Sequence, residues 1–407
     1  PDRRAHELHD LMGVPADEIL RVSAKEGAGI DALLEAIVHQ VPPPSGNVDA
    51  PLRALIFDSY YDRYRGAIPT IRVVDGRLKP GMEIAFGSHR DDHYEVAEVG
   101  YLRLTQQPTE FLEAGEVGYV VANIRGVRET RVGDTVLDAA NPAKELLPGY
   151  REAHPMVFAG LYPTEPNKYE DLRDALEKLQ LNDAALHYEP ETSVALGFGF
   201  RCGFLGLLHM DIVRERLERE FDLDLITTVP NVEYHVYHTN GTMELIENPT
   251  KMPQGSEVER IEEPYVRARI AAPAEYIGAI MQLGQERRGI YLGMDYLDPT
   301  RVQFNWEFPL AEIILDFYDR LKTISRGYAT LDYEFLGLRA SEVVRLDMLI
   351  NGEPVDAFSI IMHRDKSYDW GKKLAGKLRE LIPRQLFEVV IQAAIGSKII
   401  ARESIRP

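Results

Sequence analysis

The chain has 407 residues, a formal net charge of −19, 45% hydrophobic residues and 27% charged residues. This length predicts about three or four domains, and the composition is that of an ordinary globular protein. The acidic balance argues against a generic polyanion binder, and the sequence lacks the run of eighteen apolar residues that a membrane-spanning helix needs. The chain begins with Pro1 directly before a helical pattern, without a signal peptide, so we expect a fragment or a processed product.

Residues 1–46 have an α/β pattern. Helical spacing covers residues 4–12, a short strand is expected at residues 19–22, and a second helix is expected over residues 29–38. The Pro-Pro-Pro-Ser-Gly run at 42–46 ends that helix and predicts a linker.

Residues 47–148 change to short strands separated by turn signals such as Asp75-Gly76 and Pro80-Gly81. Close turn spacing without a long helix predicts an antiparallel β-barrel. Its expected strands are 53–58, 70–74, 82–86, 94–101 and 117–123.

Two ferredoxin-like β-α-β-β-α-β units are predicted next, over 149–240 and 264–345, joined by a polar linker over 241–263. In the first unit we expect a helix over 205–221 with the apolar residues Leu208, Ile212, Leu217 and Phe221 on one side, and a closing strand at 232–237. Trp306 and Trp370 are interpreted as packing residues. His235 and His238 are too few for a metal site.

The last segment, 346–407, is predicted to form a hairpin and a basic helix near residues 368–381. Residues 361–407 hold ten Lys/Arg and five Asp/Glu, so this segment carries about +5 and the remainder about −24. Both a solvated basic helix and a localised nucleic-acid or membrane contact are open interpretations of this asymmetry.

Cys202 is the single cysteine, which excludes an intrachain disulfide and a cysteine zinc site. Its apolar, glycine-rich setting and the lack of a nearby base favour a buried structural thiol over a nucleophile. A reducing, cytoplasmic compartment is therefore expected.

Several motifs carry a resemblance to known proteins. IFDSYYD at 56–62, LKPGM at 78–82 and VGDT at 132–135 resemble the barrel domain of translational GTPases, and GFLGLLHMDI at 203–212 resembles the third domain of elongation factor G. YEPET at 188–192, QERRG at 285–289, LKTISRGYA at 321–329, IQAAIG at 391–396 and IIARE at 399–403 resemble LepA-type proteins. The chain is therefore identified as a member of the LepA group of translational GTPases.

The resemblance implies a multidomain α/β and β architecture. It comprises the end of a P-loop GTPase domain (1–46), a β-barrel (47–148), two ferredoxin-like domains and the beginning of a LepA-specific C-terminal domain (346–407). Ser23, Ala24 and Lys25, followed by EGAGI, resemble the last guanine-binding loop of these GTPases. Taken alone, this tripeptide is also compatible with a surface turn.

The chain departs from the family in one respect that matters for chemistry. It contains no GxxxxGK[ST] phosphate loop, and the magnesium ligands, the catalytic histidine and the NKxD motif of the family are expected before Pro1. The lysine-rich tail of the family is expected beyond Pro407. We therefore expect GTP and Mg²⁺ to be cofactors of the intact protein, and this chain alone to lack catalytic and metal-binding residues and to be inactive.

The resemblance also implies partners. The intact protein is expected to be a monomeric, ribosome-binding elongation factor that hydrolyses GTP and acts in fidelity or back-translocation, facing ribosomal RNA and the transfer RNA region. The RNA-contact candidates, each of which is equally compatible with a plain surface charge, are Arg287, Arg288, Arg326, Lys372, Lys373, Lys377 and Arg379. The alternative is a non-enzymatic RNA- or membrane-binding module, with the basic tail on anionic lipid at the cytoplasmic face of the membrane.

Overall fold

The computed structural model describes residues 2–126, 129–149, 154–183, 185–253, 255 and 257–407. The chain divides into two compact units, residues 1–149 and 150–407, each of which is described by itself. Within the described residues, no helix combines the length and apolar character needed to cross a membrane.

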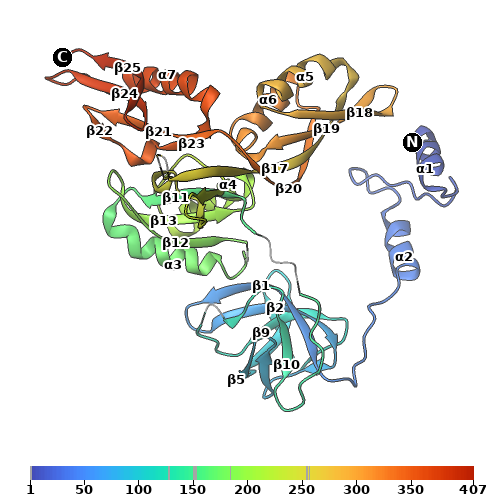
Figure 1. The fold of residues 1–407 in the computed structure, drawn as a ribbon. Helices are drawn as coiled ribbons and strands as arrows, with labels where there is room; N and C mark the ends of the chain where they lie inside the picture. Colours follow the sequence, from blue (N-terminus) through green and yellow to red (C-terminus); the bar gives the residue numbers. More distant parts are fainter. Residues whose placement is uncertain (1, 127–128, 150–153, 184, 254, 256) are drawn as a thin grey trace. The chain divides into compact units, whose positions relative to one another are not determined.

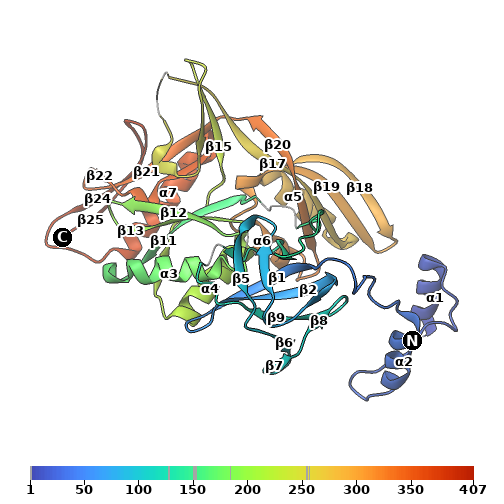
Figure 2. The ribbon, with the colours of Figure 1, turned by 90° about the horizontal axis from the view of Figure 1, so that it is seen from below.

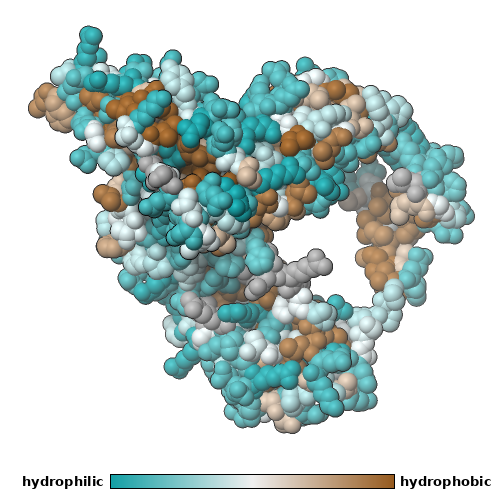
Figure 3. Space-filling model, viewed as in Figure 1, coloured by the Kyte–Doolittle hydropathy of each residue, from teal (hydrophilic) through white to brown (hydrophobic). Residues whose placement is uncertain are grey.

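The first unit begins with helices α1 (Asp2–Met12) and α2 (Ile30–Gln40). Helix α2 has no buried residue, and its apolar residues Leu34, Ile37 and Val38 form a hydrophobic surface (Figure 3). The strand expected at residues 19–22 was wrong: only an isolated bridge between Ser23 and Ala28 forms there. A strand needs a partner for its backbone groups, and no described strand of this unit lies beside residues 19–22.

An eight-stranded antiparallel sheet follows, in the order β5-β4-β10-β1-β2-β9-β6-β7. Strands β1, β2, β5, β9 and β10 of this sheet are labelled in Figure 1. The sheet curls around one apolar core that includes Ile56, Ile71, Phe86 and Val99. The interval 94–101, predicted as one strand, is divided between β5 and β6 because the pairing partner changes: β5 pairs with β4, whereas β6 pairs with β9. The strands are β1 (Arg53–Asp62), β2 (Gly66–Asp75), β4 (Glu83–Phe86), β5 (His89–Glu95), β6 (Glu98–Leu102), β7 (Gln106–Thr109), β9 (Val117–Val121) and β10 (Thr135–Asp138), with a separate ribbon of β3 (Arg77–Leu78) and β8 (Leu112–Glu113).

The second unit opens with a ferredoxin-like domain whose sheet order is β12-β13-β11-β14. Its elements are β11 (Val157–Pro163), α3 (Tyr169–Leu179), β12 (His187–Ser193), β13 (Gly197–Phe204), α4 (Leu207–Phe221) and β14 (Leu225–Thr227). The β-α-β-β-α-β prediction is thus confirmed, with one correction. The closing strand is β14, whereas the predicted closing strand overlaps β15 (Tyr234–His238), which pairs with another sheet.

Helix α4 buries only part of the predicted apolar side. Met210, Val213 and Leu217 are buried and Phe221 packs against the same core, whereas Leu208 and Ile212 are exposed. The apolar spacing alone did not show which of these positions face the core.

A second ferredoxin-like domain is built on the long strand β17 (Val258–Pro273), with the strand order β20-β17-β19-β18 (Figure 2). Its other elements are α5 (Ile277–Glu286), β18 (Ile290–Asp298), β19 (Arg301–Pro309), α6 (Phe317–Ile324) and β20 (Thr330–Ala340), and β15 and β16 (Met243–Ile246) extend the sheet. The segment 241–263, expected to be a polar linker, therefore contains β16 and the first residues of β17. Trp306 is fully buried in this core, as predicted.

The C-terminal layer is a sheet in the order β22-β21-β24-β25, with helix α7 (Arg364–Leu381) packed against it. Its strands are β21 (Val343–Ile350), β22 (Glu353–Pro354), β23 (Ile360–His363), β24 (Val389–Ile395) and β25 (Lys398–Ile405). The Asp356 carboxylate accepts hydrogen bonds from Ser193 Oγ at 2.9 Å and from the backbone N–H of Val194 at 2.7 Å. This contact attaches the C-terminal layer to the first ferredoxin-like domain.

Candidate functional site: an exposed basic surface and a buried arginine network

The predicted guanine loop is an exposed turn in this chain. The backbone N–H of Ser23 donates to the Ala28 carbonyl at 2.9 Å, and Ser23 Oγ accepts from the N–H of Glu26 at 3.3 Å. Ala24 and Lys25 are exposed. Gly29 has a φ of +75° and approaches the Arg21 carbonyl so closely that a Cβ would lie 2.4 Å from the oxygen. The loop is thus ordered by its own backbone, but the chain supplies no phosphate loop opposite it.

The predicted cations of helix α7 lie on its solvent side. Lys372, Lys373, Lys377 and Arg379 are all exposed, whereas Gly371, Ala375 and Leu378 face the sheet. Lys377 pairs with Glu380 at 3.2 Å, and both side chains are about 60% exposed, so solvent screens the pair. This amphipathic arrangement leaves a row of ammonium groups available for phosphate contacts.

Two further arginines, which the sequence analysis did not single out, extend this basic surface. Arg402 and Ser404 lie on strand β25, and Arg406 directly follows its end. Together with Arg379 they line a shallow hollow of about 460 Å³. Glu403 also lines the hollow and pairs with Arg379 at 2.6 Å. The period-two spacing of Arg402, Ser404 and Arg406 was the signal in the sequence, because alternate residues of a strand share a face.

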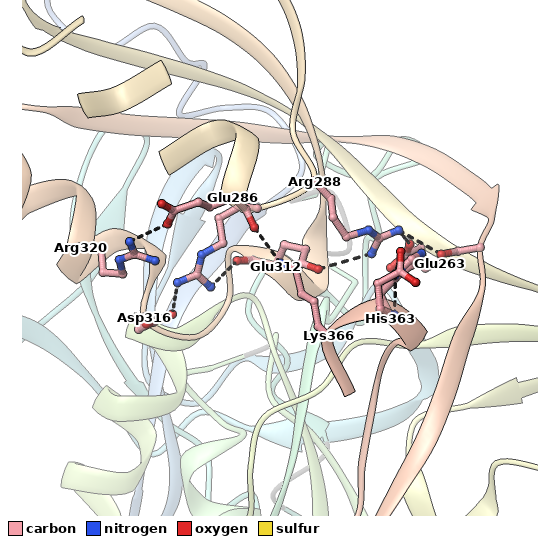
Figure 4. A network of polar contacts seen from close by, with 11 residues as sticks. Glu263, Glu286, Arg288, Glu312, Asp316, Arg320, His363 and Lys366 are labelled. Atoms are coloured by element: carbon pink, nitrogen blue, oxygen red, sulfur yellow. Dashed lines mark hydrogen bonds and ion pairs between the residues drawn. The ribbon is translucent and has the colours of Figure 1, made fainter. Parts of the chain in front are cut away.

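Arg288 lies in a different environment from these exposed cations. Its guanidinium group donates to Glu263 at 2.6 Å and to Ser341 Oγ at 3.0 Å, and it lies 3.5 Å from Glu312 (Figure 4). Burial opposes the charge of Arg288, yet the hydrogen bond and the negative charges of Glu263 and Glu312 raise its pKa above the ordinary value. Glu263 is only 1% exposed, so this last residue of the predicted polar linker lies in the protein interior.

Arg287 is also engaged within the protein. Its side chain is 13% exposed and pairs with Asp316 at 2.6 Å. Burial works against the Asp316 charge, but the Arg287 hydrogen bond and charge prevail and lower the pKa of that carboxyl. The structure therefore brings Arg287 and Arg288 into a network of internal ion pairs, apart from the exposed row on α7.

Lys366 connects this network to helix α7. Its ammonium group donates to the Glu286 carbonyl oxygen at 2.9 Å and contacts the Glu312 carboxylate, while Glu286 pairs with Arg320 at 2.8 Å (Figure 4). Hydrogen bonds and ion pairs thus connect four elements, namely α5, the turn around Glu312, α6 and α7. Such a network fixes the C-terminal layer on the second ferredoxin-like domain.

Arg326 lies in an exposed turn after helix α6. It has a φ of +51°, and the next residue, Gly327, donates its N–H to the Lys322 carbonyl at 2.7 Å. Tyr328, two residues further along the chain, is 67% exposed. An exposed arginine and an exposed aromatic residue in one short segment are compatible with a nucleic-acid contact.

Cys202 is fully buried in the first ferredoxin-like core, and burial raises the pKa of its thiol far above the ordinary value. This is the environment of a structural thiol, not of a nucleophile.

Three sequence families match consecutive parts of the chain. "Elongation factor Tu domain 2" matches residues 66–137, "Elongation factor G C-terminus" matches residues 260–348, and "GTP-binding protein LepA C-terminus" matches residues 350–407.

Two curated relatives are proteins named elongation factor 4. The one from Chlorobaculum tepidum is 58% identical over 401 residues, and the one from Chlorobium luteolum is 57% identical. Each alignment covers 98% of this chain and 66% of the relative, so the chain spans just under two thirds of their length. A crystal structure of a Thermus thermophilus protein shares the fold at a TM-score of 0.53 with 20% identity, covering 78% of this chain and 60% of the other.

Proposed function

Because this chain belongs to the elongation factor 4 (LepA) family, we propose that the intact protein is a ribosome-binding GTPase of translation elongation. It hydrolyses GTP to GDP and phosphate and serves fidelity or back-translocation. The observation that supports this most strongly is the 58% identity to an elongation factor 4 along 98% of the chain. The order of the matching families, from barrel to C-terminal domain, supports the same conclusion.

Within this proposal, the described domains supply ribosome recognition. The cations Lys372, Lys373 and Lys377, with the hollow beside Arg379, contact the phosphates of ribosomal RNA near the transfer RNA region. Arg326 is a second contact, from the exposed turn of the second ferredoxin-like domain. Arg287 and Arg288 act indirectly, by holding the C-terminal layer in place.

Hydrolysis of GTP by this family needs a phosphate loop, and this sequence has the Ser23–Lys25 turn but no such loop. Within this proposal, we therefore expect this chain alone to be inactive. Measurable GTP hydrolysis by the purified chain, above that of a mock preparation, would overturn this part of the proposal.

The domain boundaries stay part of the proposal. They assign 1–46 to the end of the GTPase domain, 47–148 to the barrel, 149–240 and 264–345 to the ferredoxin-like domains, and 346–407 to the beginning of the LepA-specific domain. The monomeric state and the cytoplasmic location belong to the same proposal.

A second candidate function rests on a separate observation. Beside the cations of α7, Leu381, Leu386 and Phe387 are 66%, 100% and 58% exposed. Basic groups next to exposed apolar side chains suit peripheral binding to an anionic membrane surface. Flotation with phosphatidylserine vesicles tests it: a bound wild-type chain and an unbound Leu386→Ser/Phe387→Ser variant support membrane association, and flotation of neither chain contradicts it.

The main proposal is tested by sedimenting the chain with purified ribosomes across a series of salt concentrations. Phosphate contacts release counterions, so pelleting is expected to decrease steeply as salt rises. Equal pelleting at all salt concentrations would exclude recognition by the basic surface.

A further inference from the structure

The turn between β12 and β13 binds a carboxylate of the C-terminal layer. Asp356 accepts hydrogen bonds from Ser193 Oγ at 2.9 Å and from the backbone N–H groups of Val194 at 2.7 Å and Ala195 at 3.2 Å. Ser193 Oγ also accepts from the Leu196 N–H at 3.0 Å, which orders the turn. Hydrogen bonds to a charged acceptor are stronger than neutral ones. These three bonds, the Asp356 clasp, therefore join two segments that lie 161 to 163 residues apart in the sequence.

The Asp356 clasp is a polar contact with little apolar burial. The Val194 side chain is 95% exposed, and Asp356 is partly exposed. A space of about 30 Å³ remains beside the contact and is lined mainly by polar residues, such as Thr192, Thr228 and Ser359. Contacts with few buried apolar groups open locally at a lower free-energy cost than a packed core. The clasp can therefore open while the cores on both sides of it stay folded.

Asp356 is connected to helix α7 through the packed interior of the C-terminal layer. It begins the short helix η6 (Asp356–Phe358), and the Ser359 hydroxyl that follows donates to Asp347 Oδ1 on β21 at 2.8 Å. Phe358 packs against the core of the layer, as does Trp370 of α7. Packed interiors transmit displacements, so the position of Asp356 and the position of α7 are coupled.

Separate contacts hold the C-terminal layer on the second ferredoxin-like domain. Arg345 Nη1 donates to the carbonyl oxygens of Thr250 and Met252, between β16 and β17, at 3.1 and 3.3 Å. In that same segment, Asn248 donates to Glu191 of the first ferredoxin-like domain. The Asp356 clasp differs from these contacts because it joins the layer directly to the β12–β13 turn.

We propose that Asp356 is a positioning residue, whose clasp on the β12–β13 turn holds the basic face of helix α7 at a fixed place relative to the first ferredoxin-like domain. The positioning role rests on the ribosome recognition proposed above, in which Lys372 and Lys377 of α7 contact RNA phosphates. Asp356 does not touch the RNA, and acts by keeping these cations in the arrangement that binds. With the clasp open, only a fraction of the chains has this arrangement, and the apparent affinity decreases by that fraction.

The clasp is tested by a distance measurement without ribosomes. Spin labels on cysteines introduced at positions 194 and 377 report the separation of the turn from α7. Val194 and Lys377 are suitable because both side chains are exposed, and Val194 binds Asp356 through its backbone. The native Cys202 is buried and stays unlabelled. Double electron–electron resonance should give one narrow distance distribution for the labelled chain and a broad one after Asp356→Ala.

Two further variants control for the loss of charge and of shape. Asp356→Asn keeps one acceptor oxygen, so an intermediate width is expected. Glu353→Ala removes a carboxylate from a nearby exposed position on β22, and the distribution is expected to stay narrow.

The positioning role is tested by sedimenting the unlabelled chains with purified ribosomes. Asp356→Ala is expected to bind about fivefold more weakly than the wild type, with the same salt dependence because the number of phosphate contacts is unchanged. Glu353→Ala is expected to bind like the wild type. Protection of Cys202 from a thiol reagent checks that the first ferredoxin-like core of Asp356→Ala is folded. If this protection is lost, Asp356→Asn takes its place.

The outcomes separate the clasp from the ribosome proposal. A narrow distance distribution for Asp356→Ala would overturn the clasp and leave the ribosome proposal intact. Equal ribosome affinity of Asp356→Ala and the wild type, or a changed salt dependence, would overturn the positioning role. If the wild-type chain does not pellet, the ribosome proposal and the positioning role both fail, whereas the distance measurement still decides whether the clasp exists.

Discussion

The arginine network around Arg288 and the exposed face of helix α7 are both rich in cations, but their charges are used differently. Arg288 lies between Glu263 and Glu312, and the Glu263 side chain is 1% exposed. Lys372 and Lys373 are exposed on α7. A buried cation stabilises the fold because its removal leaves a buried carboxylate unpaired, whereas an exposed cation contributes little to stability and is available for a partner. The role of an arginine or lysine therefore cannot be assigned from its residue type alone, because it also depends on whether the side chain is buried.

The largest effect is expected when the buried pair is broken. Arg288→Ala should lower the free energy of unfolding by about 3 kcal/mol, because it leaves the Glu263 carboxylate buried and uncompensated. Arg287→Ala is the matched control, since its partner Asp316 is 61% exposed and can be hydrated, so a loss of about 1 kcal/mol or less is expected. Urea denaturation of both variants measures the difference, and equal losses would contradict the distinction.

Cys202 lies in the core of the first ferredoxin-like domain, and its reactivity measures how readily that core opens. Burial raises the pKa of its thiol, so the native chain at pH 8 should react with a thiol reagent roughly a hundredfold more slowly than the urea-unfolded chain. The rate at which Ellman's reagent reacts with the thiol, followed by the absorbance of its coloured product, measures this difference between the native and unfolded chains. A native rate close to the unfolded rate would show that the first ferredoxin-like core opens readily.

The exposed face is tested by removing charge without changing the fold. Lys372→Gln/Lys377→Gln should weaken ribosome binding about tenfold at moderate salt and reduce the salt dependence by about one to two phosphate contacts. The free energy of unfolding should change by less than about 0.5 kcal/mol, because both side chains are exposed. Unchanged pelleting with unchanged stability would assign these lysines to a plain solvated surface.

A fourth prediction concerns the half-buried carboxylate of Glu247, which directly follows strand β16. Burial and the nearby negative charge of Glu233 raise the pKa of Glu247 to about 7 from an ordinary value of 4.5. The folded state therefore holds this proton more tightly than the unfolded state, so its contribution to stability is present below about pH 4.5 and is lost as the pH rises through about 7. Because solvent reaches the half-buried group, we expect a loss of only about 1 kcal/mol.

Glu247→Gln should remove this pH dependence. The variant should match the wild type in urea denaturation at pH 5 and exceed its stability at pH 8. A wild-type chain that gains stability relative to the variant between pH 5 and pH 8 would contradict the raised pKa.

The sequence predicted the architecture well where local patterns determine it. Two β-α-β-β-α-β units follow from alternating strand and helix periods, and both sheets have the strand order expected for them. The closing strand of the first unit was wrong because both Leu225–Thr227 and Tyr234–His238 have strand character. Only the pairing of strands in the folded protein shows that β14 joins the sheet of the first unit and β15 joins that of the second.

Part of the candidate site could also be predicted, because local sequence patterns determine it. Lys372 and Lys377 could be placed on a basic helix from their spacing, and they are exposed as expected. The burial of Arg287 and Arg288 could not be predicted, because their partners Asp316 and Glu263 lie 29 and 25 residues away in the sequence. The Asp356 clasp joins segments still farther apart, because Ser193 lies 163 residues before Asp356.

The central claim is that the described domains recognise the ribosome without a phosphate loop. Its most direct test is co-sedimentation of this chain with purified ribosomes over a series of salt concentrations, with no added nucleotide. The account predicts pelleting at low salt that falls steeply with rising salt, and a weaker dependence for Lys372→Gln/Lys377→Gln than for Arg287→Ala. The absence of pelleting at the lowest salt concentration would contradict it.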